Sequence, residues 1–236
     1  MSNAPYFLLK SKNGSKLGYE ELTDSMINDG LLWVVYNNIH MNNYAESCAK
    51  VFSFKREELD VYSINQFKKA QQAQYNNVFK EEIVKVLIKD KTNDIFFELD
   101  EGSYKVMYEK ISLPKSIFDK NGVVTAANSS SINDGDAALL IRSEKKAAEL
   151  RLILLVKIIA QTLAAKTPIQ FTTIPTDTIN KILAKAGLTK DNIDLYEINK
   201  AFAVVSLVIN KLLNLDNSKV NVNGGTIALG LLIGAS

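Results

Sequence analysis

The sequence predicts an α/β protein, a layered sandwich with helices on both faces of a sheet and an α-rich cap domain beside it. In the second half of the chain, strand-like apolar runs alternate with helical patterns, which is typical of a sheet covered on both faces. Helical spacing dominates the first half. The 236 residues, 47% of them hydrophobic, can bury one sizeable core or two modest ones. We therefore expect a cap domain over residues 1–125 and a core half over residues 126–236.

Two helices are expected in the first half. Residues 44–51 form a short one, and Asn42 and Asn43 ahead of it offer capping groups. From Glu57 to about Val78, apolar side chains recur at helical spacing between lysines, glutamates and glutamines, which predicts an amphipathic surface helix. Residues 95–99 are β-like, although no clean period surrounds them.

Three helices and four strands are expected in the second half. One capped helix spans Ser143 to Leu150, and another lies between Asp177, which can cap it, and Gly187, which can end it in the left-handed conformation. The segment Ala201 to Leu213 is apolar on nearly every face, which predicts a helix buried between layers. Short apolar runs predict the strands, at residues 137–141, 152–159, 193–198 and 220–222.

The last stretch, NVNGGTIALGLLIGAS, is a glycine-rich turn after the final expected strand. Its glycines, with Ser236 in an N-cap-like position, are typical of a strand-to-helix turn that lets the backbone approach a ligand. Leu231 and Leu232 stand where an active-site loop usually carries a polar group. The turn thus has the form of a site without an evident catalytic side chain. Its glycines are Gly224, Gly225, Gly230 and Gly234.

Composition excludes several classes of partner and site. The 28 basic and 26 acidic side chains leave a net charge of +2, which favours neither nucleic acid nor an anionic membrane. One cysteine and one histidine are too few for a disulfide or a zinc site of the usual kind. The N-terminus lacks the order of a signal peptide, and the most apolar run, Leu152 to Ala165, is shorter than the roughly 20 residues of a membrane span. We expect a cytoplasmic protein with no nucleic-acid or membrane partner.

Several segments together resemble the thiolase family, most closely its acetyl-CoA acetyltransferase branch. In family order they are MSNAPYFL, INDGLLWVVYNNIHM, FDKNGVVTAANSSSINDGDAAL, AGLTKDNIDLYEINKAFA and NVNGGTIALG. The resemblance implies a partial thiolase-like αβα sandwich, with a loop domain over residues 1–125 and an incomplete core half after it. It also implies Claisen condensation of acyl-CoA, or the thiolytic reverse. Coenzyme A thioester is then the substrate, and no cofactor or metal is required.

The resemblance also assigns candidate site residues. Asn199 lies at a strand-to-helix junction, where asparagine is commonly an N-cap, but in the family it holds a water in an oxyanion hole. His40 by itself is more often a packed or surface group, whereas the resemblance implies that His40 and Met41 shape the acyl and pantetheine pocket. Ser130, otherwise an ordinary loop hydroxyl, matches the serine that contacts the pantetheine arm. The matching pocket-lining residues, each of which could equally be core, are Phe118, Ala126, Ala201 and Phe202.

The chain also departs from the family pattern. Leu231 and Leu232 occupy the places of a histidine that activates the nucleophile and a proline, and leucine can neither move a proton nor donate a hydrogen bond from its side chain. Lys200 matches a glutamate, whereas Asn42 and Ser131 match glycines. These changes weaken the expected catalytic chemistry.

Neither family cysteine is expected in this chain. The nucleophilic cysteine of thiolases lies upstream of the segment that resembles MSNAPY, and the cysteine that acts as base lies downstream of the segment that resembles GLLIGAS. Cys48, on a predicted helix, is more simply a buried structural thiol with a raised pKa than a replacement nucleophile.

Two functions follow from the resemblance. The first is a thiolase-family acyl-CoA acyltransferase by ancestry, inactive as this chain. Its remaining portions come from another polypeptide, as in a split thiolase with a complementary N-terminal half, or were lost. The second is a non-catalytic coenzyme A-binding or scaffold relic. Leu231 favours loss of activity, because a working enzyme needs the histidine. Acyl-CoA or coenzyme A is the expected ligand. We also expect apolar surface around Ala201 to Leu213, and therefore self-association or a partner chain.

Overall fold

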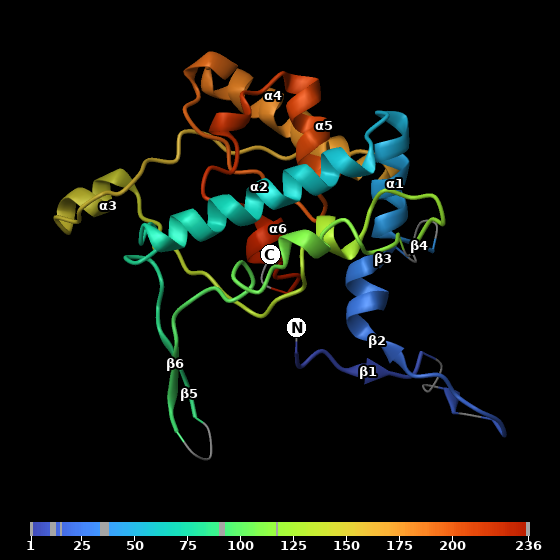
Figure 1. Ribbon diagram of the computed structural model, residues 1–236. Helices are drawn as coiled ribbons and strands as arrows, with labels where there is room; N and C mark the ends of the chain where they lie inside the picture. The colour runs from blue at the N-terminus through green and yellow to red at the C-terminus, as the bar shows by residue number, and fades with distance from the viewer. Residues whose placement is uncertain are drawn as a thin grey trace.

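The computed structural model describes residues 2–9, 13–14, 16–33, 38–89, 93–116 and 118–234 (Figure 1). Ser236, and residues 34–37 within the segment INDGLLWVVYNNIHM, therefore lie outside the described residues. None of the described helices is long and apolar enough to cross a membrane. In chain order, the strands and α-helices are β1 (Tyr6–Phe7), β2 (Thr23–Asp24), β3 (Leu32–Trp33), β4 (Ile39–His40), α1 (Met41–Val51), α2 (Arg56–Tyr75), β5 (Val86–Ile88), β6 (Ile95–Phe97), α3 (Glu144–Glu149), α4 (Ile174–Ala186), α5 (Ala203–Leu213) and α6 (Thr226–Leu229).

Short helical turns of other types connect these elements. A π-helical segment, Met26–Leu31, joins β2 to β3. Single 3-10 turns lie at Tyr108–Lys110, Ala126–Asn128, Lys190–Asn192 and Asn217–Lys219, and a longer one, Pro168–Thr173, leads directly into α4.

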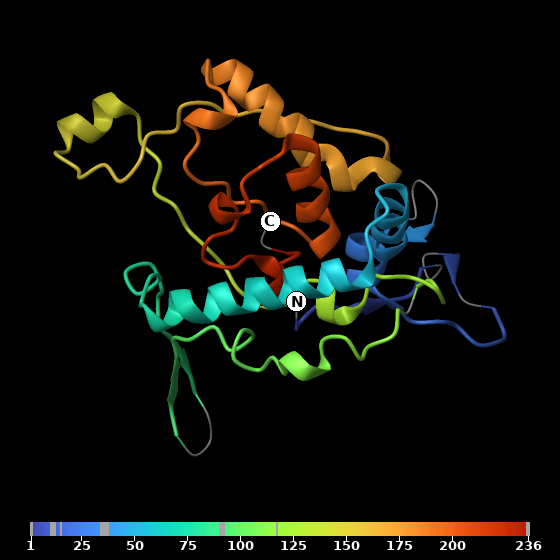
Figure 2. The ribbon, with the colours of Figure 1, turned by 45° about the horizontal axis from the view of Figure 1, so that its top comes forward.

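Helix α5 lies at the centre of the core and packs against α1, α2 and α4 (Figures 1 and 2). Its apolar residues point in every direction, so neighbours on several sides are needed to cover them. Ala203, Val204, Val208 and Ile209 are fully buried. The predicted buried helix is confirmed. The exposed apolar surface expected around it is largely wrong, because Leu212 is the only exposed apolar residue of α5.

Helix α2 crosses the molecule and covers this core with one stripe of its surface (Figure 2). Leu59, Ser63, Gln66, Ala70 and Ala73 are buried, at alternating spacings of four and three residues. At its start the Glu58 carboxylate accepts a hydrogen bond from Lys55 N at 2.7 Å, which satisfies a free amide of the first turn. The predicted helix is confirmed, but its buried stripe carries the polar side chains of Ser63 and Gln66, so it is less amphipathic than expected. It ends at Tyr75, slightly earlier than predicted.

Helix ends agree only partly with the expected caps. Ser143 caps α3, and Gly187 ends α4 with φ at 68°, both as predicted. Helix α1 begins earlier than expected, because the His40 ring, and not Asn42 or Asn43, provides its cap. Asp177 lies within the first turn of α4 and does not cap it, because that helix starts at Ile174.

Sheet structure in the described residues consists of three antiparallel two-stranded ladders, β1–β2, β3–β4 and β5–β6. The β5–β6 hairpin extends away from the body of the molecule, and its residues are exposed (Figure 1). The β-like character of residues 95–99 is confirmed by β6.

The strands expected at residues 137–141 and 152–159 are not formed. Both segments are non-helical and exposed, with Leu139 at 89% and Leu155 at 92% of full exposure. Within the described chain, no backbone group of residues 153–159 bonds to another backbone group. A strand that is apolar on both faces needs a paired neighbour and covering layers, and the described residues supply neither.

The strands expected at residues 193–198 and 220–222 meet at one parallel bridge, between Tyr196 and Val220. Asn221 then takes a left-handed conformation, with φ at 47°, which ends the extended pairing. Its side chain continues the contact instead: Oδ1 accepts from Ile198 N at 3.1 Å, and Nδ2 donates to Ile198 O at 3.0 Å. The two segments are thus joined by a side chain where a ladder was expected.

Candidate functional site

The loop that carries Ser130 is bonded to the segment just before α5. Ser130 Oγ donates to Lys200 O at 2.7 Å, and Ser130 N donates to Ala201 O at 2.8 Å. An antiparallel bridge pairs Ser129 with Phe202. Three of the residues assigned by resemblance, Ser130, Ala201 and Phe202, are thereby brought together from positions about 70 residues apart in sequence. Phe202 is buried in the core, whereas Ala126, in the same loop as Ser130, is exposed.

A second group forms at the start of α1. The rings of His40 and Phe118 stack with centroids 4.5 Å apart and an interplanar angle of 22°. Met41 packs against the hydrophobic cluster that also contains Phe202, so both groups border the same core. His40 Nδ1 accepts a hydrogen bond from Asn42 N at 3.3 Å. Burial lowers the pKa of His40, which leaves the imidazole neutral at pH 7 and suited to contact rather than to proton donation.

Asn199 is exposed and lies between two buried residues, Ile198 and Lys200. Helix α5 begins at Ala203 with Phe202 at the N-cap, so Asn199 lies too far upstream to cap it. The ordinary N-cap interpretation is therefore wrong. The adjoining backbone is held in place, because Lys200 N donates to Thr226 Oγ1 at 3.2 Å and that hydroxyl donates back to Lys200 O.

The glycine-rich turn packs against the protein itself. Gly224 has φ at 80°, and a Cβ there would lie 2.7 Å from Ala70 Cβ and 2.9 Å from Gln66 O, both on α2. Glycine is therefore required for the close approach of α2. At Gly224 the backbone therefore approaches α2, whereas the sequence predicted that it approaches a ligand. The short helix α6, inside this turn, was not expected from the sequence.

The end of the turn is hydrogen-bonded to the residues that follow Ser130. Leu231 N donates to Ser131 O at 2.7 Å, and Asn133 N donates to Leu231 O at 3.2 Å. Gly230 has φ at 88° and lies against the Asn133 side chain. Leu231 is half-buried, next to the loop that the resemblance assigns to coenzyme A. Its side chain brings no proton donor or acceptor to this position.

The burial of Lys200, whose carbonyl accepts a hydrogen bond from Ser130, was not predicted from the sequence. Lys200 is only 2% exposed, and its Nζ reaches across to α2, 3.4 Å from Gln66 Oε1 and 5.6 Å from the centre of the Tyr62 ring. Burial lowers the pKa of Lys200 to about 7, although the Glu197 carboxylate acts in the opposite direction. Its spacing of two residues from the apolar Ile198, which places both on one face of an extended segment, is a sequence signal that could have indicated the burial. Its ammonium points to α2, while its carbonyl receives Ser130.

Cys48 is buried on α1, and burial raises the pKa of its thiol. A thiol with a raised pKa is a poor nucleophile, because the thiolate is the reactive form. The predicted burial of Cys48 is confirmed.

Comparison with family models gives two matches that together span nearly the whole chain. The model for the thiolase N-terminal domain matches residues 1–145, and that for the thiolase C-terminal domain matches residues 152–236. The two models meet between residues 145 and 152, whereas the division at residue 125 stays a prediction.

Acetyl-CoA acetyltransferases of several organisms are similar to this chain over its full length. It is 45% identical over 236 residues to an acetyl-CoA acetyltransferase of Yarrowia lipolytica and 42% identical over 239 residues to one of Schizosaccharomyces pombe. All of this chain is matched in both comparisons, but only 58% and 60% of the relatives. The chain thus spans about three-fifths of the length of the curated relatives it matches.

Solved structures show the same relationship. The Bacillus anthracis acetyl-CoA acetyltransferase superposes with a TM-score of 0.91 at 33% identity, over 98% of this chain and 58% of the other. The Acat5 thiolase of Ascaris suum, solved in complex with coenzyme A, superposes with a TM-score of 0.88 at 33% identity, over 100% of this chain and 60% of the other. The predicted α/β fold class is confirmed, and the chain belongs to the thiolase family.

Proposed function

We propose that this chain forms the coenzyme A-binding part of a thiolase-type acyl-CoA acyltransferase of the acetyl-CoA C-acetyltransferase kind. The supporting observation is the pair of hydrogen bonds that holds Ser130 against the segment after Asn199. The Ser130 hydroxyl donates to Lys200 O, and its lone pairs are left to accept a bond from an amide N–H of a pantetheine arm. The His40–Phe118 stack supplies ring surface at the start of α1, where Met41 packs against the cluster that contains Phe202.

We expect the chain by itself to bind coenzyme A but to catalyse neither thiolysis nor Claisen condensation. Thiolysis and Claisen condensation need a reactive thiolate, a base and oxyanion donors. The only cysteine in these 236 residues is buried, and Leu231 stands where the resemblance places the activating histidine. Asn199 remains as the one family catalytic position with its side chain intact.

We propose further that the rest of a thiolase, supplied as a complementary polypeptide, covers the exposed apolar segments at residues 137–141 and 152–159. Two observations support this covering polypeptide. The extended backbone of residues 153–159 has no backbone partner within the described chain. About two-fifths of each relative has no counterpart in this chain. The reducing cytoplasm is the compartment that we propose, because it suits the single thiol.

Calorimetry with coenzyme A tests the binding proposal. The chain should give a 1:1 isotherm, weak because Asn42 and Ser131 carry side chains where the family has glycine. Ser130→Trp should block the channel, whereas Ser218→Trp, at an exposed serine outside the candidate site, should bind as the unmodified chain does. No heat at millimolar ligand would contradict the proposal.

Thiolysis of acetoacetyl-CoA tests the catalytic proposal. The purified chain should show no turnover above a blank. Turnover that Asn199→Ala abolishes would show that the chain is a working enzyme. Co-expression with the part of the Yarrowia lipolytica relative that this chain does not match should yield a 1:1 complex. Self-association of the chain without that complex would point instead to a second copy as the occupant.

A further inference from the structure

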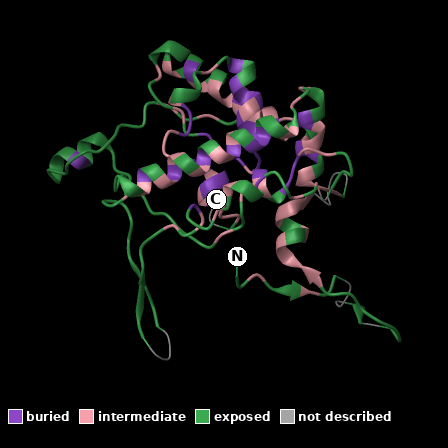
Figure 3. Ribbon diagram, viewed as in Figure 1, coloured by how far each residue is buried: buried purple, intermediate pink, exposed green. Residues whose placement is uncertain are grey.

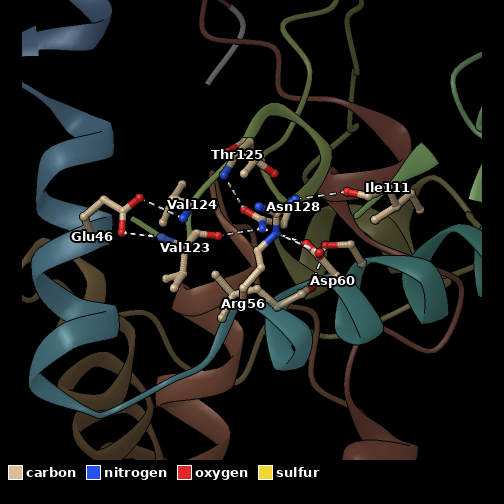
Figure 4. A network of polar contacts seen from close by, with 11 residues as sticks. Glu46, Arg56, Asp60, Ile111, Val123, Val124, Thr125 and Asn128 are labelled. Atoms are coloured by element: carbon tan, nitrogen blue, oxygen red, sulfur yellow. Dashed lines mark hydrogen bonds and ion pairs between the residues drawn. The ribbon is translucent and has the colours of Figure 1, made fainter. Parts of the chain in front are cut away.

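A partly buried polar network joins the loop over residues 123–130 to helices α1 and α2 (Figure 4). From α1, the Glu46 carboxylate accepts hydrogen bonds from Val123 N at 2.9 Å and Val124 N at 2.8 Å. It also accepts one from Ser116 Oγ at 2.9 Å. Backbone N–H groups bonded to a carboxylate form strong, charge-assisted hydrogen bonds. Glu46 therefore fixes the backbone where the loop begins.

The Asn128 side chain forms hydrogen bonds to the backbone of its own loop. Its Oδ1 accepts from Thr125 N at 2.8 Å, and its Nδ2 donates to Val123 O at 3.0 Å and to Asp60 Oδ1 at 2.9 Å. The side chain is completely buried, so both amide protons and the carbonyl oxygen must find partners inside the protein. Asn128 lies only two residues before Ser130.

Asp60 on α2 anchors this amide. Its second oxygen pairs with Arg56 Nε at 2.7 Å, one turn earlier on the same helix, and Arg56 Nη2 donates to Ile111 O at 3.2 Å. Asp60 is buried, and a buried carboxylate is tolerated only when its oxygens are paired. The loop over residues 123–130 is thus held by Glu46 from α1 and by the Arg56–Asp60 pair from α2.

We infer that Glu46 and the Asn128–Asp60 pair are positioning residues that hold Ser130 in place for the pantetheine arm. This inference rests on the proposed function. Five of the hydrogen bonds go to backbone groups, four of them in the loop, so the network determines the path of the chain and not merely the packing of side chains. If one bond is lost, a buried amide is left unsatisfied, and the loop shifts toward water to satisfy it.

Two variants test the inference against a matched control. Glu46→Gln keeps the shape of the side chain but presents an amide group to one backbone N–H, and Asn128→Ala removes the amide. Ser63→Ala is the control, because Ser63 is also completely buried on α2 but donates only to Leu59 O of its own helix. We expect Glu46→Gln and Asn128→Ala to weaken coenzyme A binding about tenfold and Ser63→Ala to leave it unchanged.

Hydrogen exchange without ligand provides a second readout. The amides of Val123, Val124, Thr125 and Ser130 should exchange faster in Glu46→Gln and Asn128→Ala than in the unmodified chain, and not in Ser63→Ala. Asp60→Ala combined with Asn128→Ala should weaken binding by less than the sum of the two single changes, because both remove the Asn128–Asp60 bond. If Asn128→Ala does not fold, the isosteric Glu46→Gln still decides the question.

The outcomes separate the two proposals. If the unmodified chain binds no coenzyme A, the proposed function fails, and the exchange of the loop amides still decides whether the network positions the loop. If the unmodified chain binds and both variants bind equally well, the positioning inference is overturned. Unchanged exchange of the loop amides in both variants overturns it as well.

Discussion

Helix α5 and the segment at residues 152–159 have similar apolar compositions, but the helix is mostly buried and the segment is exposed (Figure 3). The helix reads AVVSLVINKLL and the segment LILLVKII, each apolar almost throughout. Eight residues of α5 are buried, whereas all eight residues of the segment are exposed. Apolar composition alone therefore does not decide burial.

The difference lies in what each backbone needs from its neighbours. An α-helix satisfies its own N–H and C=O groups, so α5 needs only side-chain contacts from α1, α2 and α4. An extended segment must pair its backbone with another strand before its side chains can be covered. The described chain provides the helices around α5 but no strand beside residues 153–159.

Truncation of one side chain in each region should give the largest contrast. Ile209→Ala in α5 should lower the free energy of unfolding by about 3 kcal/mol, because it leaves a cavity among fully buried neighbours. Leu155→Ala should change it by less than about 0.5 kcal/mol. Urea denaturation of both variants measures this difference. A large loss in Leu155→Ala would show that the segment is covered in solution and would break the comparison.

The pH dependence of stability should reveal the buried Lys200 beside the core. Its pKa is about 7 in the folded chain, against a usual value of 10.5. Between these values the unfolded chain binds a proton that the folded chain does not, so stability rises with pH, by about 2 kcal/mol from pH 7 to pH 9. Below pH 7 the full cost of the buried charge is present.

Lys200→Met should remove this slope, whereas Lys181→Met, at an exposed lysine on α4, should retain it. Thermal melts at several pH values provide the measurement. An equal slope in the Lys200→Met variant would mean that another group controls the pH dependence.

Charge placed on the exposed segment should act on association and not on folding. Leu155→Lys should reduce self-association and the binding of an apolar dye, because it interrupts a continuous apolar surface. The midpoint of urea unfolding, measured at low protein concentration, should shift by less than that of Ile209→Ala. Sedimentation at rising concentration tests the first effect. Association that is unaffected by the lysine would place the contact elsewhere.

The smallest effect is expected at α3, which lies between the two exposed segments. Ser143 Oγ accepts from Lys146 N at 3.2 Å, and Ser143→Ala removes this cap. The local cost is about 1 kcal/mol, but the helix is short and exposed, so the global unfolding midpoint should hardly move. Faster amide exchange confined to α3 would confirm this. A clear drop in the midpoint would show that α3 packs on the core in solution.

Local patterns in the sequence determined the helices and the family. Spacing alone indicated α2 and the burial of α5, because a helix makes its hydrogen bonds within itself. Motif order indicated thiolase membership and the candidate group of Ser130, Ala201 and Phe202. That Ser130 and Ala201 are hydrogen-bonded follows only from the structure, because residues so far apart meet through tertiary packing.

Only the tertiary structure decided which apolar and polar groups are covered. It left residues 152–159 exposed, buried the charge of Lys200 against α2, and placed Gly224 against Ala70. It also began α5 too late for Asn199 to cap it. These properties depend on groups distant in the sequence. The solvation of a charge, the pairing of a strand and the space beside a Cβ are all set by neighbours that no local pattern contains.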